Sequence, residues 1–139
     1  MLKEIHNHMV DELQQNTRTD TIFVVTAIVF NLIVLAVNSA VAGEADSPHA
    51  DPSSDIVLIV FIIMSILVNT IATIALNTGK GSRKKIITGL LAMYTDNDVD
   101  KYYDSTLMQG YDKRYLLFNA VILCLAVTGI AVPLIIRFI

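Results

Sequence analysis

The sequence predicts an all-α membrane protein with three transmembrane helices, an N-terminal amphipathic helix and a cytoplasmic helical connection between spans two and three. Hydrophobic residues make up 54% of the 139-residue chain and charged residues only 17%, so the chain lacks the polar side chains that would cover a core in water. Three apolar runs each reach the roughly 20 residues that a helix needs to cross a bilayer. Three strands could not close a barrel, so we expect helices and a single membrane domain over residues 1–139.

The first element expected is an amphipathic helix over residues 1–18, because apolar residues recur there at spacings of three and four. Such a helix lies on the cytoplasmic membrane face or packs against a neighbour. Thr19 or Asp20 then supplies an N-cap for the first span. The apolar residues of the first element are Leu2, Ile5, Met9 and Leu13.

The three spans are expected over residues 21–42, 56–77 and 113–138. The first two runs contain no charged residue. The stretch from Ala40 to Gly43 also resembles a signal-peptidase site. The length of the run and the acidic residues before it favour a retained span over a cleaved signal peptide.

The loop over residues 43–55 is short and acidic. In a ring of subunits its carboxylates would concentrate cations at a pore mouth. In a single chain they keep the turn solvated, and Ser54 or Asp55 caps the second span. The acidic residues of this loop are Glu44, Asp46, Asp51 and Asp55.

The connection over residues 78–112 is too long for a simple turn. Its segment Gly79 to Gly81 is expected to end the second span, and Ser82 to cap an interfacial helix whose bases Arg83, Lys84 and Lys85 meet lipid headgroups. All five tyrosines fall between residues 94 and 115, which indicates that the connection follows the membrane surface.

The connection also holds an acidic stretch from Asp96 to Asp104. Its acids match several ligand positions of a calcium loop, but the stretch lacks the glycine and the final glutamate of that pattern. Helix capping is the favoured interpretation of this stretch, and no metal ligand is assigned.

The distribution of bases predicts the orientation of the chain. Lys and Arg gather before the first span and between spans two and three, and the first loop has none. We therefore expect a cytoplasmic N-terminus and an outside C-terminus, in a plasma or inner membrane.

Several amides and hydroxyls lie within the predicted spans. Because spans one and two are antiparallel, Asn31 and Asn69 should lie at similar depth and find hydrogen-bond partners. These side chains would either join the helices to one another or line a polar path. The candidate set is Asn31, Asn38, Asn69, Thr73, Asn77 and Asn119.

Composition and motifs exclude several classes of function. The net charge of −3 argues against nucleic-acid binding, and the chain carries no catalytic or dinucleotide-binding motif. We therefore expect no enzyme activity and no cofactor. The leading hypothesis is a homo-oligomeric, channel-like assembly, with a preference for cations as a further expectation. The alternative is a non-catalytic accessory or scaffold subunit of a larger membrane complex, and a third possibility is a protein that acts on lipids through its amphipathic helices.

Overall fold

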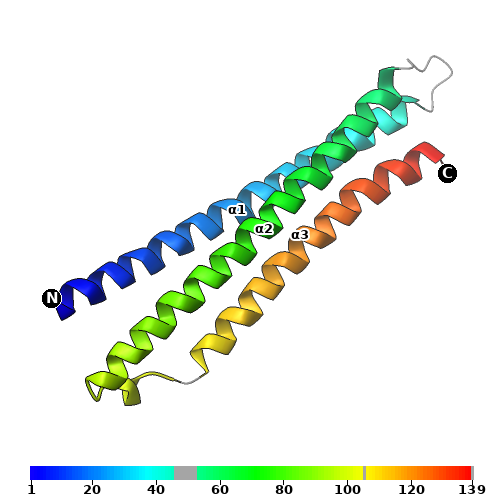
Figure 1. Ribbon diagram of the computed structural model, residues 1–139. Helices are drawn as coiled ribbons and strands as arrows, with labels where there is room; N and C mark the ends of the chain where they lie inside the picture. Colours follow the sequence, from blue (N-terminus) through cyan, green and yellow to red (C-terminus); the bar gives the residue numbers. More distant parts are fainter. Residues whose placement is uncertain (46–52, 105, 139) are drawn as a thin grey trace.

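The computed structural model describes residues 1–45, 53–104 and 106–138, and these residues form helices with short connections (Figure 1). Helix α1 comprises Leu2–Ala45, α2 comprises Ser53–Asp96 and α3 comprises Leu107–Phe138. A single 3-10 turn, η1, covers Asp100–Tyr102. The prediction of an all-α fold with three helices long and apolar enough to cross a membrane is confirmed.

The three helices lie side by side in an up-down-up arrangement (Figure 1). Helix α2 is antiparallel to both neighbours, so α1 and α3 run in the same direction. The N-terminus and η1 lie at one end of the bundle, which we call the amino end, and the C-terminus lies at the other.

A seven-residue pattern of buried positions holds the helices together. Spacings of four and three recur along the helices, and this repeat keeps one narrow seam facing the neighbouring helices in a bundle. The buried positions of α1 are Asp20, Val24, Ala27, Asn31, Val34, Asn38 and Ala42; those of α2 are Leu58, Ser65, Asn69, Ala72, Leu76, Gly79, Arg83, Ile87 and Leu90; those of α3 are Tyr115, Ile122, Ala126, Gly129 and Pro133.

An apolar belt surrounds the bundle where the three predicted spans lie. Large apolar side chains are exposed on all three helices there, for example Ile22, Ile63 and Leu116. Water would make such a surface costly, whereas lipid does not. The belt comprises residues 21–42, 56–77 and 116–138, and its composition is that of a membrane protein.

The N-terminal amphipathic helix is not a separate element. Residues 1–18 were expected to lie apart from the first span, but α1 runs without a break from Leu2 to Ala45. Asp20 is therefore inside the helix and does not cap it. The reason is tertiary packing: Asp20 is 6% exposed and occupies one of the seam positions.

The second span likewise does not end at Gly79 to Gly81. Helix α2 continues through both glycines to Asp96, so the segment expected as an interfacial helix is its final part. The remaining connection is short and, among its described residues, contains only η1 as regular structure. Contacts with α1 along residues 79–94 hold this part of α2 in place, as described below.

Helices α1 and α2 consequently project past the apolar belt at the amino end. This extension comprises residues 2–19 of α1 and 80–96 of α2, and at 1.5 Å per residue its α1 part is about 27 Å long. Helix α3 begins later and covers only the part of the extension nearest the belt (Figure 1). The outer part of the extension is thus a pair of helices.

Candidate functional site

A buried polar cluster joins all three helices where the extension meets the belt. Asp20 of α1, Arg83 of α2 and Tyr115 of α3 are each at least 94% buried. The Tyr115 hydroxyl donates a hydrogen bond to Asp20 Oδ2, and the Arg83 guanidinium donates one to Thr17 Oγ1. The Arg83 guanidinium also lies 4.7 Å from the centre of the Tyr111 ring.

The backbone of α2 approaches α1 very closely at this level. A Cβ atom on Gly79 would lie 2.2 Å from Asp20 Oδ1, so no larger residue fits without movement. Asn16 Nδ2 donates a hydrogen bond to the Gly79 carbonyl oxygen over 3.0 Å. Gly79 therefore serves the contact between two helices, which explains why the helix continues through it despite the low helix propensity of glycine.

The charges in this cluster compensate each other. A buried guanidinium is tolerated only with nearby acceptors, negative charge or aromatic faces. Asp20 supplies negative charge, Thr17 an acceptor, and the Tyr111 and Tyr115 rings supply aromatic faces at 4.7 and 6.0 Å. Within the Arg83 guanidinium, Nε is the one nitrogen that is buried and has no hydrogen-bond partner among the described residues.

A second polar contact lies deeper, in the middle of the belt. Asn31 Nδ2 donates to Asn69 Oδ1 over 2.8 Å, and Asn69 Nδ2 donates back to Asn31 Oδ1 over 2.9 Å. The same two amides bond to the carbonyl oxygens of Ala27 and Ser65. The expectation that Asn31 and Asn69 find hydrogen-bond partners is confirmed.

We expect Asn31→Leu alone to lower the free energy of unfolding by about 0.6 to 1.7 kcal/mol, because it leaves the Asn69 amide without its partner in a site that excludes water. The double variant Asn31→Leu/Asn69→Leu should recover part of that loss, since neither amide is then left unpaired. Unfolding in mixed micelles, followed by circular dichroism, measures both values. A double variant that is less stable than the sum of the two single variants would contradict this account.

The other predicted polar candidates occupy different environments. Asn38 is fully buried, and both atoms of its amide lack a hydrogen-bond partner among the described residues. Thr73 is half-buried, Asn77 is exposed and Asn119 is half-buried, and these three lie beside the seam between α2 and α3. The candidate set is therefore split between the interior of the bundle and its surface.

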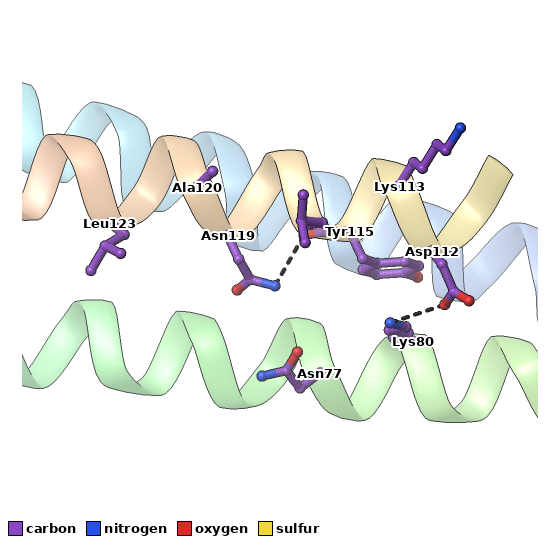
Figure 2. Close-up of a pocket in the computed structure, with 9 residues that line it drawn as sticks. Asn77, Lys80, Asp112, Lys113, Tyr115, Asn119, Ala120 and Leu123 are labelled. Atoms are coloured by element: carbon purple, nitrogen blue, oxygen red, sulfur yellow. Dashed lines mark hydrogen bonds and ion pairs between the residues drawn. The ribbon is translucent and has the colours of Figure 1, made fainter. Parts of the chain in front are cut away.

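An open groove follows the α2–α3 seam. Its part at the edge of the belt has a volume of about 630 Å³ and is lined by polar and apolar residues, which Figure 2 shows. Asn77 of α2 and Asn119 of α3 line this part, the Asn119 side chain extends toward α2, and Lys80 Nζ lies 2.9 Å from Asp112 Oδ1. A second part of about 360 Å³ continues into the belt, and Leu123 lines both parts. We call the two parts together the seam groove.

The three predicted headgroup bases are separated by their positions on α2. The Arg83 side chain is buried in the interior of the bundle, so the prediction that it meets lipid headgroups is wrong. Lys84 and Lys85 are exposed, and a headgroup role for them stays a prediction. Sequence reasoning gave Asp20 only a capping role and did not single out Tyr115. The available signal was their spacing of four and seven residues from the next seam positions, Val24 and Ile122.

The acidic residues near the first loop are also placed differently. Asp55 lies in the first turn of α2 and bonds to Arg137 near the end of α3, with Oδ1 2.9 Å from Nε and Oδ2 3.2 Å from a terminal nitrogen. The hydrogen bond from Arg137 lowers the pKa of the Asp55 carboxyl. Glu44 is exposed at the end of α1. Asp46 and Asp51 lie outside the described residues.

The acidic stretch from Asp96 to Asp104 forms the turn that contains η1. Asp98 has a positive φ of 56°, and Asp104 Oδ1 accepts hydrogen bonds from the backbone and hydroxyl of Thr106, which lower the pKa of its carboxyl. Across the described part of the chain, no three histidine, cysteine or acidic side chains group in a way that could hold a metal ion.

The tip of the extension carries an aromatic contact and exposed apolar side chains. His6 Nε2 lies 2.9 Å from the Tyr94 hydroxyl, and the Tyr94 and Tyr103 rings stack with centres 4.7 Å apart. The hydrogen bond with Tyr103, together with burial, raises the pKa of Tyr94 to about 12. A groove of about 270 Å³ lies beside this contact, between Leu2 and Val99. We call the exposed side chains here the tip patch: Leu2, Ile5, Val99, Tyr102 and Tyr103.

Comparison of this chain with protein-family models, with curated proteins and with solved structures finds no match.

Proposed function

We propose that this protein is a non-catalytic accessory or scaffold subunit of a larger membrane complex, and that it contacts its partner through the tip patch. The observation that carries the proposal is the extension itself: two helices project about 27 Å past the belt and end in exposed apolar side chains. Leu2 is 53% exposed and Tyr102 77% exposed, at a distance from the belt where the hydrocarbon core no longer covers them. Apolar patches of this kind on a polar rod mark contact sites for other proteins.

The polar contacts within the bundle support the same proposal. Asn31 and Asn69 bond to each other in the interior, and so they are not available to line a path between subunits. Asp20, Arg83 and Tyr115 join the three helices at the base of the extension. The bundle is therefore a preformed support for the extension, which suits a subunit that positions a partner.

The proposal is tested by the size of the complex that contains this chain in its native membranes, measured on native gels after mild solubilisation. We expect Leu2→Glu to shift the chain from a large complex to the size of the free protein, because the added charge would be desolvated in the contact. Gln14→Glu is the matched control: it adds the same charge to an exposed position of α1 and should leave the complex intact. An unchanged complex in Leu2→Glu would refute contact through the tip patch.

A channel-like homo-oligomer is the second candidate function, and one observation favours it. Thr73, Asn77 and Asn119 lie along the seam groove, so a ring of chains with these grooves turned inward would enclose a polar path. Planar-bilayer recording on the purified protein distinguishes the two functions. Conductance that Asn77→Leu abolishes would support the channel, and absence of conductance in a chain of native fold would support the accessory role.

A further inference from the structure

We propose that the seam groove is a binding site for one anionic phospholipid, with its headgroup at Lys80 and an acyl chain along the α2–α3 seam. The groove changes character along its length in the way that such a molecule requires. At the edge of the belt it is lined by Asn77, Lys80, Asp112 and Asn119. Farther along most of its lining is apolar, for example Ile66, Ile74 and Val127, and the polar residues there are Asn69, Thr70 and Thr73. The site is separate from the tip patch and does not depend on the accessory role.

The charges around the headgroup end favour an anion. Lys80 and Lys113 line the groove, and Lys84 lines a small pocket that shares Lys80 and Asp112 with it. Three lysines and one aspartate thus line the groove or the pocket beside it. Basic pockets between transmembrane helices at the membrane surface attract anionic headgroups. Lys80 carries most of this role, because Lys113 points away from α2 (Figure 2).

The amide of Asn77 is the second polar group of the site. It is exposed, lines the groove and makes no hydrogen bond with the described residues. Asn77 precedes Lys80 by three positions in α2, and this spacing corresponds to a rise of about 4.5 Å along the helix axis. The Asn77 amide therefore lies just below the headgroup level, where the ester or phosphate oxygens of a lipid would accept its hydrogen bond.

The length of the groove fits an acyl chain from one leaflet. From Lys80 to Ile66 the groove follows 14 residues of α2, or about 21 Å. Half of a hydrocarbon core of about 30 Å is shorter than this, so the chain of a lipid anchored at Lys80 would lie within the groove. Leu123 lines both parts of the groove and therefore lies against the middle of that chain.

The absence of tryptophan from the sequence provides a direct test. We would place a single indole in the groove with Leu123→Trp, an exposed position, and a matched one outside it with Val121→Trp. Quenching by spin-labelled phosphatidylglycerol and spin-labelled phosphatidylcholine would then be compared on the full-length protein in lipid nanodiscs. Stronger quenching by the anionic lipid is expected for Leu123→Trp only. Equal quenching by both lipids at Leu123→Trp would overturn the proposal.

Charge variants in the Leu123→Trp background locate the headgroup. Lys80→Gln should weaken the association of phosphatidylglycerol about fivefold, the effect of one base at a membrane surface. Arg18→Gln removes the same charge from an exposed position of α1 outside the groove and should leave the association unchanged. An equal loss of phosphatidylglycerol association in both variants would mean that the lipid is attracted to the whole basic surface, and it would overturn the proposed site. A dimer without bound lipid, detected by native mass spectrometry, would assign the groove to a second copy of the chain and also overturn it.

Discussion

Asp20→Asn is expected to lower the free energy of unfolding by about 1.5 to 3 kcal/mol, because it gives the Tyr115 hydroxyl a neutral acceptor in place of a carboxylate and removes a negative charge near the buried Arg83 guanidinium. Asparagine has nearly the same shape and still offers an oxygen to the Tyr115 hydroxyl, so the loss reports on charge more than on packing. Unfolding in mixed micelles, followed by circular dichroism, measures the difference.

The double variant Asp20→Asn/Arg83→Met is the control for this prediction. It removes both charges together and should be more stable than Asp20→Asn alone, since a buried pair costs least when both members are present or both are absent. If Asp20→Asn stays within about 0.5 kcal/mol of the wild type, the range of ordinary surface substitutions, then charge compensation between Asp20 and Arg83 does not stabilise the bundle.

Gly79→Leu is expected to separate α1 from α2 and to destabilise the bundle by about 1 to 3 kcal/mol, the usual cost of overpacking. The first added atom already lies 2.2 Å from Asp20 Oδ1, and the hydrogen bond from Asn16 to the Gly79 carbonyl would be lost as the helices move apart. The same unfolding experiment measures this loss, and distances between spin labels on α1 and α2 measure the separation.

Gly81→Ala is the matched control for Gly79, because it lies two residues away on the same helix with no atom within 4 Å of an added Cβ. It should stabilise α2 by up to about 1 kcal/mol, the gain in helix propensity. A loss of stability at Gly79 and a gain at Gly81 are expected together only if α2 is continuous and the two glycines differ in their contacts. A loss of stability at both positions would contradict the continuous helix.

The membrane-spanning part of the fold could be predicted from sequence because the length of an apolar run is a direct physical requirement of the bilayer. The contact between Asn31 and Asn69 was also predictable, since antiparallel spans of similar length bring residues at equal depth together. Both predictions depended only on depth and polarity, and neither needed knowledge of how the helices pack.

The continuity of the helices could not be predicted from local propensities. Gly79 to Gly81 is a typical end of a helix and Thr19 or Asp20 a typical beginning, but tertiary contacts override both signals here. The seam spacing that runs through Ala72, Leu76, Gly79 and Arg83 was the feature that indicated one unbroken helix. It is hard to recognise in a membrane protein because the lipid-facing residues are as apolar as the seam residues.

The seam groove was beyond sequence reasoning for a related reason. Thr73, Asn77 and Asn119 were identified as polar candidates, yet their separation from Asn31, Asn38 and Asn69 depends on which side of α2 faces α1 and which faces α3. That choice is made by packing at the small residues Ala72 and Gly79, which allow α1 to approach.

The unbroken 44-residue helices couple the orientation of the extension to that of the membrane-spanning part of the bundle. Helices α1 and α2 continue without a break from the belt to the tip, and contacts among Asp20, Arg83 and Tyr115 join the helices where the extension begins. A tilt of the bundle within the bilayer therefore also moves the tip. A tilt of about 10° would carry the tip roughly 5 Å sideways over an arm of about 27 Å. Changes in bilayer thickness, which helices accommodate by tilting, would therefore be converted into sideways displacement of the tip.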